Sequence, residues 1–235
     1  MAGGAGRSGG LTRKKGSTTL WEDLPAEVMT ATLKAHDRAL RKALVAAHGY
    51  LSATEGDAWI AAFHGPTDAA TFALLATRFL SETVWPPELL EHPEARTETQ
   101  GDRAPPSLKV RVGLHSGAAK AERNEHSHAI EYSGRAFDLA RAVGDSGKGG
   151  GVLLTGSTLA LIDSTRLEEA LGGPPAAFHA GDFRYELMEK GDTARIDASL
   201  IYLLPPVGET DGDDEMRGRA LLAPPCPIRG PEQLR

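Results

Sequence analysis

Two segments repeat apolar residues every three or four positions, the spacing of one face of an α-helix. In residues 25–47, alanine, valine and leucine recur at this spacing, and lysine, arginine and aspartate fill the positions between them. Pro25 suits a first helical turn, and Gly49 suits a helix end. Residues 66–80 place Phe72, Leu80 and several alanines on one side. We therefore predict two amphipathic helices.

Strand patterns lie between and after these helices. Residues 108–115 alternate apolar and polar side chains, which is the period of a half-buried strand. Two short apolar runs flank Glu55-Gly56-Asp57, which predicts a β-hairpin with a tight turn. The remaining elements are predicted as strands at 50–54, 58–63, 152–155, 183–188 and 199–204, and as helices at 132–143 and about 157–162, with a glycine-rich break at 147–151.

Segments without such periodicity set the limits of the domain. Residues 1–10 are rich in Gly and are expected to be a disordered extension, and residues 86–107 a surface insertion. Residues 205–235 are Pro-rich and carry an acidic run, as in a mobile tail. The interval 11–204 mixes strands and helices with at least one hairpin, which predicts an α+β domain with helices packed on a sheet.

Composition narrows the class of protein. The chain of 235 residues has 40% hydrophobic residues, which is typical of a globular protein. Its formal charge is −6, so bulk nucleic-acid binding is not expected. The single cysteine, Cys226, excludes an intrachain disulfide and a cysteine-based zinc cluster. No apolar run approaches the length of a membrane helix, and no signal peptide is evident. The expected location is cytoplasmic, with association to the cytoskeleton or a cilium left open.

Five short blocks occur in a fixed order along the chain. They are G-S-T-T-L-W-E (16–22), H-G-Y (48–50), E-G-D-A-W-I-A-A-F (55–63), K-V-R-V-G-L-H-S-G (109–117) and G-G-G-V-L-L-T (149–155). Together they resemble the catalytic domain of class III nucleotidyl cyclases, the adenylyl and guanylyl cyclases, over roughly residues 11–204. The insertion and the loop before Tyr132 are most similar to receptor-type forms of protozoa and to algal or bacterial relatives.

The resemblance implies a ferredoxin-like βαββαβ core with an antiparallel-rich sheet. It also implies head-to-tail dimers, with the nucleotide bound at the dimer interface. Two aspartates would hold two Mg²⁺ or Mn²⁺ ions, because divalent cations neutralise the charge on the leaving pyrophosphate. An Asn and an Arg from the other side of the interface would orient the ribose and stabilise the transition state.

The two metal positions of this resemblance differ from each other. Arg13 stands where the first metal aspartate would be, and a guanidinium repels a cation and cannot ligate it. Asp57 matches the second aspartate, although its plain role is that of a turn residue. One carboxylate therefore remains where two are needed.

The transition-state positions also depart from the resemblance. Asp138 stands in place of the Asn and Ala142 in place of the Arg. Arg141 lies one residue earlier, at a spacing that still shares a helix face with Asp138, so it is a candidate to replace the lost Arg. The alternative is that Asp138 and Arg141 form only a solvated helix pair.

The purine-reading positions fall at Ala53, which offers no hydrogen bond, and at Glu131, which retains an acceptor. Lys190 is a loose candidate for the lysine that would contact phosphate.

The strand that should precede the Gly-Ser-Thr turn is poorly supported by the sequence. Residues 3–10 are mostly glycine, which has low strand propensity. Three explanations stay open: a short strand at 10–15, a strand supplied by another segment or chain, or upstream sequence beyond the start given.

Other polar and aromatic residues have ordinary structural readings. His126 and His128 indicate a polar loop rather than a metal pair, and His115 a packed core histidine rather than a catalytic base. Trp21 and Trp59 are expected in the core.

These residues favour a catalytically degenerate cyclase homology domain that serves as a dimerisation, binding or structural module. Its expected partner is a second copy, another cyclase-like domain or a larger assembly, and Mg²⁺ or Mn²⁺ is expected only if a nucleotide binds. The alternative is an active or complementing cyclase subunit that makes cAMP or cGMP from ATP or GTP. A weaker possibility is a ferredoxin-like domain with no cyclase ancestry.

Overall fold

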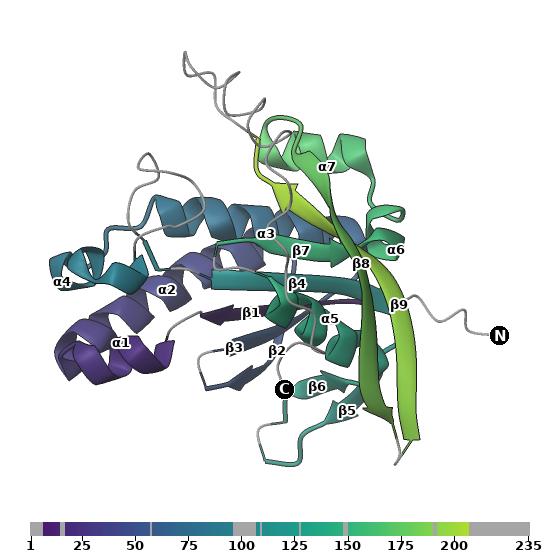
Figure 1. Cartoon of the computed structure of the whole chain (residues 1–235), viewed down its shortest axis with the longest axis horizontal. Coiled ribbons are helices and arrows are strands. Elements are labelled where there is room, and N and C mark those ends of the chain that lie inside the picture. Colours follow the sequence, from purple (N-terminus) through teal and green to yellow (C-terminus); the bar gives the residue numbers. More distant parts are fainter. Residues whose placement is uncertain are drawn as a thin grey trace.

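The protein is built on one seven-stranded sheet (Figure 1). The structure, a computed structural model, describes residues 7–14, 17–56, 58–95, 107–108, 110–126, 128–147, 150–189 and 192–206. The sheet order is β2-β3-β1-β4-β7-β9-β8, and β5 and β6 form a separate two-stranded hairpin. The strands are β1 (Arg7–Lys14), β2 (Tyr50–Glu55), β3 (Ala58–Phe63), β4 (Val110–Gly117), β5 (Lys120–Arg123), β6 (Ile130–Ser133), β7 (Val152–Thr155), β8 (Ala176–Glu189) and β9 (Asp192–Leu204).

Helices alternate with these strands along the chain, so the predicted α+β class is confirmed. The helices are α1 (Ser17–Asp23), α2 (Ala26–Ala46), α3 (Pro66–Ser81), α4 (Pro87–Glu91), the 3-10 helix η1 (Pro93–Ala95), α5 (Arg135–Ser146), α6 (Gly156–Leu159) and α7 (Ser164–Leu171). None of the helices among the described residues is both long enough and apolar enough to span a membrane.

The glycine-rich start of the chain forms the central strand. Every residue of β1 pairs antiparallel with β4, and Ser8 to Thr12 also pair with β3. The expectation of disorder through residue 10 was therefore wrong for residues 7–10, and residues 1–6 lie outside the described part. The low strand propensity of glycine is overridden here because β1 has a hydrogen-bonding partner on both edges. The strand comes from this chain itself, which answers the question left open by the sequence.

The two faces of the sheet are covered differently. Alternate residues of β3 point to opposite faces: Trp59 joins the main core with α2 and α3, whereas Ile60 packs with Phe137 of α5. Farther along α5, Leu139 and Val143 pack with Leu153 of β7 and with residues of β8 and β9. The paired helices α2 and α3 therefore cover one face, and the single helix α5 covers the other.

A close approach fixes α5 on the sheet. A Cβ atom on Gly113 of β4 would lie 2.1 Å from the carbonyl oxygen of Ala140 and 2.3 Å from the amide nitrogen of Gly144. Only glycine therefore allows β4 and α5 to pack at this distance.

The core differs in detail from the pattern expected in the sequence. In α2 most of the predicted stripe is buried, including Ala39, Ala43 and Leu44, and Met29, His36 and Leu40 are buried beside it, although the pattern did not include them. Trp59 is buried as expected, but Trp21 is 47% exposed, so its predicted place in the core was wrong. The short helix α1 buries Leu20 instead, because neighbouring helical residues point in different directions.

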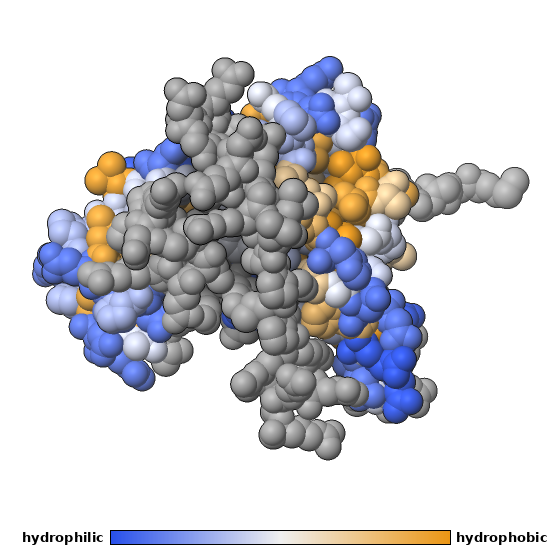
Figure 2. All heavy atoms as spheres, turned by 45° about the horizontal axis from the view of Figure 1, so that its top comes forward, coloured by the Kyte–Doolittle hydropathy of each residue, from blue (hydrophilic) through white to orange (hydrophobic). Residues whose placement is uncertain are grey.

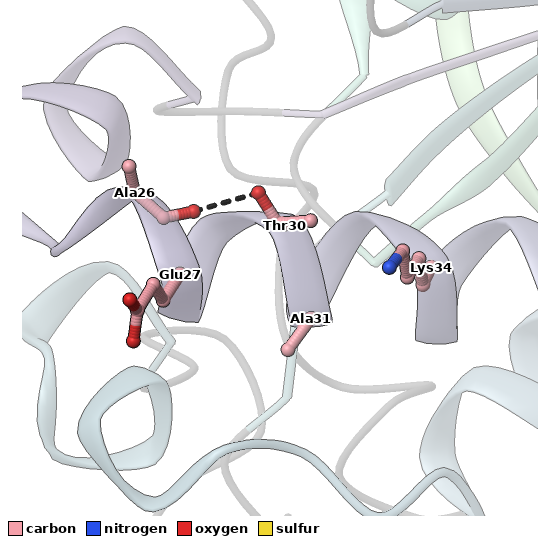
Figure 3. Close-up of a pocket in the computed structure, with 5 residues that line it drawn as sticks. All are labelled: Ala26, Glu27, Thr30, Ala31 and Lys34. Carbon is pink, nitrogen blue, oxygen red and sulfur yellow. Dashed lines mark hydrogen bonds between the residues drawn. The ribbon is translucent and has the colours of Figure 1, made fainter.

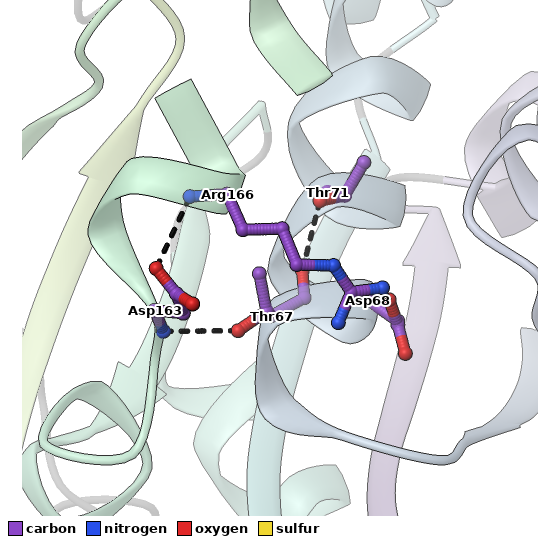
Figure 4. Close-up of polar contacts among 5 residues, drawn as sticks. All are labelled: Thr67, Asp68, Thr71, Asp163 and Arg166. Atoms are coloured by element: carbon purple, nitrogen blue, oxygen red, sulfur yellow. Dashed lines mark hydrogen bonds and ion pairs between the residues drawn. The ribbon is translucent and has the colours of Figure 1, made fainter. Parts of the chain in front are cut away.

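Several elements were not predicted. Part of the expected surface insertion is helical, and Leu89 of α4 is buried in the main core; residues 96–106 lie outside the described part. The helix α7 is joined to α3 by polar contacts (Figure 4). The Arg166 guanidinium lies 2.6 Å from Asp68, and the Asp163 amide donates to the Thr67 hydroxyl at 3.0 Å. Asp163 also caps α7 itself, because its side chain accepts a hydrogen bond from the Arg166 amide at 3.1 Å.

The β8–β9 hairpin is longer than the two strands predicted for it. Only Leu200 to Leu203 of β9 pair with β7, so the rest of the hairpin extends beyond the sheet. Exposed ion pairs cross it between Arg184 and Asp197 and between Arg195 and Glu186. Figure 2 shows the corresponding hydrophilic surface toward the hairpin tip.

Candidate functional site

The residue at the first metal position of the resemblance lies in the middle of the sheet. The register of β1 and β4 pairs Arg13 directly with Arg111. The Arg111 side chain is 18% exposed; its Nη1 donates to the backbone oxygen of Asp145 at 3.3 Å, and its Nη2 lies 3.7 Å from the Asp145 carboxylate. Its Nε is buried without a hydrogen-bond partner among the described residues. The backbone register thus places residue 13 opposite Arg111, whose guanidinium contacts Asp145.

Arg141, the candidate to replace the lost transition-state arginine, is bound inside the domain. Its Nη1 and Nη2 donate to the two carboxylate oxygens of Glu55 at 2.6 and 2.7 Å. These bonds raise the pKa of the Arg141 guanidinium; burial opposes the rise, and the nearby carboxylates of Asp138 and Asp145 add to it. The side chains of Arg141 and Glu55 are 42% and 50% exposed. The bidentate pair links α5 to the end of β2, just before the turn that contains Asp57.

Asp138 lies one turn before Arg141 on α5 and is exposed. Its carboxylate makes no hydrogen bond or ion pair in the described part of the chain, and it acts on Arg141 only through its charge. The solvated pair of Asp138 and Arg141 considered from the sequence is thus replaced by the pair of Glu55 and Arg141. Ala142 is partly buried and packs near the cluster beneath β8 and β9.

The two purine positions come from strands that lie against each other. Ser52 of β2 accepts a hydrogen bond from the Tyr132 amide at 2.8 Å, and the Tyr50 hydroxyl accepts one from the Ile130 amide at 2.9 Å. These bonds bring the neighbourhood of Ala53 to that of Glu131. Ala53 packs on a small apolar cluster that Tyr132 also contacts.

Glu131 itself is exposed and accepts a hydrogen bond from the Asn124 side-chain amide at 2.6 Å. Asn124 was not identified from the sequence as a site residue, because it lies in the turn before β6 and carries no motif. One oxygen of the carboxylate expected to read a purine amino group is therefore bound within the β5–β6 hairpin, and the second oxygen can still accept a hydrogen bond.

The described residues do not provide a donor set for a divalent cation. No group of three or more His, Cys, Asp or Glu side chains lies together among them. The carboxylates of Glu55 and Asp145 are bound by Arg141 and Arg111, and Asp57 lies outside the described residues. Mg²⁺ bound with a nucleotide usually takes one or two protein carboxylates together with phosphate oxygens. Among the expected ligands only Asp57 could supply such a carboxylate, so the metal position stays a prediction.

The histidines have structural surroundings. His115 is partly buried, and its Nδ1 lies 2.9 Å from the Thr155 hydroxyl. Burial lowers the pKa of His115, and the nearby charge of Arg135 lowers it further, so the ring is neutral at pH 7. His126 and His128 are both exposed in the turn between β5 and β6. Lys190 lies outside the described residues.

A shallow hollow of about 370 Å³ lies along the exposed side of α2 (Figure 3). It is formed by α2, where the Thr30 hydroxyl donates to the Ala26 carbonyl at 2.7 Å. Its lining consists of Ala26, Glu27, Thr30, Ala31 and Lys34, all from one helix. Polar groups do not converge on it from several elements, as they do in most ligand sites.

Sequence comparisons connect the chain to adenylate cyclases. No model of a known protein family matches it. It is 33% identical over 147 residues to an adenylate cyclase of Lachancea kluyveri. The aligned region covers 62% of this chain and 8% of that protein. It is 30% identical over 142 residues to an adenylate cyclase of Neurospora crassa, covering 60% of this chain and 6% of that protein. The chain thus spans less than a tenth of the length of these fungal relatives.

Structural comparisons agree with this. An adenylate cyclase from Trypanosoma brucei in its monomeric state superposes with a TM-score of 0.71 at 19% identity, over 88% of this chain and 91% of that one. The adenylyl cyclase CyaB from P. aeruginosa superposes with a TM-score of 0.57 at 16% identity, over 87% and 96%. The fold predicted from the five sequence blocks is confirmed.

Proposed function

Because this chain carries a domain similar in sequence and fold to the catalytic domain of class III nucleotidyl cyclases, we propose that it is a catalytically degenerate member that acts as a dimerisation or binding module. The observation that carries the proposal is the pairing of Arg13 with Arg111 in the central strands. In the cyclases that this chain resembles, the position that matches residue 13 holds the aspartate that would be the first metal ligand. A guanidinium cannot ligate a divalent cation, and the strand register puts a second arginine, Arg111, opposite residue 13.

The other half of a cyclase site is altered as well. Asp138 and Ala142 replace the Asn and Arg of the resemblance, and Arg141 is held by Glu55. A head-to-tail dimer shares each site between one chain's metal positions and the other chain's α5 positions. Because this chain has changes in both halves, a partner with an intact sequence would still meet one altered half at each shared site.

A direct assay tests this proposal. The purified chain would be incubated with ATP or GTP and Mn²⁺, and cyclic nucleotide would be measured beside an active cyclase domain under the same conditions. We expect no production above background. Robust production that Asp57→Ala abolishes would refute the proposal, because it would show a working metal site.

The alternative is a subunit that complements an active cyclase. The exposed ion pair of Arg141 with Glu55 favours it, since a half-exposed pair can exchange partners and release Arg141 to a shared site. The test is to capture a second cyclase domain that carries both metal aspartates, and to measure its activity with and without this chain. A rise in activity that Arg141→Ala removes would support complementation; no rise would exclude it.

As part of this proposal, we expect the protein to be located in the cytoplasm. No feature of the described residues supports an association with the cytoskeleton or a cilium. The activity, substrate and partners of the fungal relatives are properties of much longer proteins.

A further inference from the structure

Helix α2 carries a stripe of basic side chains on its solvent side. This basic stripe consists of Lys34, Arg38, Arg41 and Lys42. All four side chains are exposed, and none forms a hydrogen bond or an ion pair within the described part of the chain. The guanidinium carbon of Arg41 lies 5.2 Å from the ring centroid of Trp59, and the Lys42 ammonium lies 3.8 Å from that of Phe79. Aromatic rings therefore orient two of these cations, but no described carboxylate neutralises any of the four.

The spacing along the helix brings these like charges together. Lys34, Arg38 and Lys42 follow one another at intervals of four residues, so their side chains are neighbours on one face of α2. Like charges at this spacing destabilise a helix. An anionic segment lying along the stripe would relieve that repulsion.

The carboxylates near the stripe are bound elsewhere or lie farther along the helix. The Asp37 carboxylate lies 2.9 Å from Nδ1 of His36, and Glu82 of α3 is paired with Arg78. Glu27 is in the first turn of α2, seven residues before the stripe begins, which is about 10 Å along the axis. The counter-charge for the stripe therefore has to come from outside the described elements.

The sequence that follows the last described strand carries such a charge. Residues 207–235 lie outside the described part of the chain. Within them, the acidic segment 209–215 contains only carboxylates as charged groups, namely Glu209, Asp211, Asp213, Asp214 and Glu215. This segment is therefore complementary in charge to the stripe.

The described chain ends on the side of the sheet that carries α2. Pro206 lies against the end of α7, since a Cβ atom on Gly173 would be 3.3 Å from the Cβ of Pro206. Leu167 and Leu171 of α7 belong to the same core cluster as the buried residues of α2 and α3. Because α3 contacts both α7 and α2, one helix separates the start of the tail from the stripe.

The tail is long enough to cross that helix. Packed helices lie roughly 8–10 Å apart, so the step from α7 across α3 to α2 is about 20 Å. An extended chain covers about 3.3 Å per residue, so Asp211 can lie about 17 Å from Pro206 and Glu215 about 30 Å. The acidic segment can therefore reach the stripe while the described fold stays as it is.

We propose that residues 209–215 of this chain dock on the basic stripe of α2. The carboxylates supply the counter-charge that the stripe lacks. Because the tail is tethered, its effective concentration at the stripe is on the order of millimolar, so it is favoured over a free anion or the tail of another copy. This docking goes beyond the proposed function and holds whether or not the domain is active.

A docked tail gives the outer side of α2 a built-in occupant. It covers the stripe and the adjoining hollow, which Lys34 also lines (Figure 3). Any anionic partner of this surface then has to displace the tail first. Access to α2 is thus controlled by the chain itself.

Chemical cross-linking of the whole chain tests the docking. A zero-length carbodiimide joins a lysine amine directly to a carboxylate with which it is in contact, and mass spectrometry of the digested protein locates the link. We expect Lys34 and Lys42 to be linked to residues 209–215, with a fractional yield that stays the same when the protein is diluted about tenfold. Lys120 of β5, which is 70% exposed, is the matched control and should give no link to this segment.

Charge reversal shows whether the link depends on the stripe. In Lys34→Glu/Arg38→Glu, the Lys42 link should fall about threefold or more, and adding Asp213→Lys/Asp214→Lys should recover most of it. Both α2 positions are exposed and unpaired among the described residues, so the fold should be kept. Arg123→Glu/Arg135→Glu changes the net charge equally on β5 and α5 and should leave the link unchanged. About 0.5 M salt should weaken the link in the unchanged chain.

Each other outcome would overturn the docking. Links between the tail and Lys120 as frequent as those with Lys34 and Lys42 would show an unspecific tail. A yield that falls in proportion to dilution would assign the stripe to the tail of a second copy. Absence of the links, with sedimentation of the chain on phosphatidylserine vesicles, would assign the stripe to a membrane surface. Cyclic nucleotide production is measured separately and bears only on the proposed function.

Discussion

Arg141 of α5 and Glu55 of β2, 86 residues apart in the sequence, form a bidentate ion pair with bonds of 2.6 and 2.7 Å. The pair holds Arg141, which precedes the transition-state position Ala142 on α5, against the end of β2. Its effect on stability and its effect on any shared site are separate questions, and substitution addresses both.

We predict that Arg141→Ala lowers the free energy of unfolding by about 0.2–1 kcal/mol, because exposed ion pairs contribute little. Urea denaturation measures the change. Arg78→Ala is a matched control, since Arg78 and Glu82 form a similarly exposed pair on α3. A loss several times that of the control would show that the pair stabilises the packing of α5 itself.

The hydroxyl of Tyr185 predicts a pH effect. It lies 3.0 Å from the Ser146 hydroxyl in a buried position, and burial raises the pKa of Tyr185. The folded state therefore keeps its proton at a pH where the unfolded chain loses it, so stability falls as the pH rises above about 10. In Tyr185→Phe this part of the alkaline decline should disappear.

The measurement is urea denaturation of both proteins from neutral to alkaline pH. At neutral pH the variant should be less stable by about 1 kcal/mol, the contribution of one hydrogen bond. Identical pH slopes in the two proteins would contradict the assignment.

Gly113→Ala should destabilise the fold severely. Its Cβ would lie 2.1 and 2.3 Å from backbone atoms of α5, which cannot move aside as a side chain could. We expect a loss of about 1–3 kcal/mol or more, or failure to fold, measured by thermal unfolding. Gly156→Ala is the control, because its nearest neighbours would lie at 3.5 Å or more. Equal effects of the two changes would contradict the close approach.

The N-cap of α7 predicts a measurable effect on stability. Asp163 accepts the Arg166 amide at the start of α7, so Asp163→Ala should cost about 1 kcal/mol, and Asp163→Asn much less. Denaturation of the three proteins distinguishes them. If Ala and Asn cost the same, the charge of Asp163 is what matters rather than its capping bond.

Much of the fold could be predicted because local patterns agree with it. Helices α2 and α3, the β2–β3 hairpin and β4 follow from periodicity and turn residues. The cap at Asp163 and the left-handed Gly172 were available as signals for α7 and were overlooked. By contrast, β1 was only one of three explanations left open, as a short strand at 10–15, since a glycine-rich strand depends on partners that only the tertiary structure supplies.

The candidate site divides in the same way. The substitutions at Arg13, Asp138 and Ala142 were visible from the sequence. The role of Glu55 was not, because nothing local marks a contact between residues so distant in the chain. The positions of Asp57 and Lys190 stay predictions, since both lie outside the described residues.

The central place of β1 has a consequence for how this chain folds. During synthesis β1 emerges first, yet its partner β4 follows only after on the order of a hundred residues, so closing this pair carries a large loop entropy. Until β1 has docked on both partners, the edges of β3 and β4 that it covers stay unpaired and can associate with other chains. The folding step at which this domain is most open to association with other chains is therefore the late docking of β1 into the sheet.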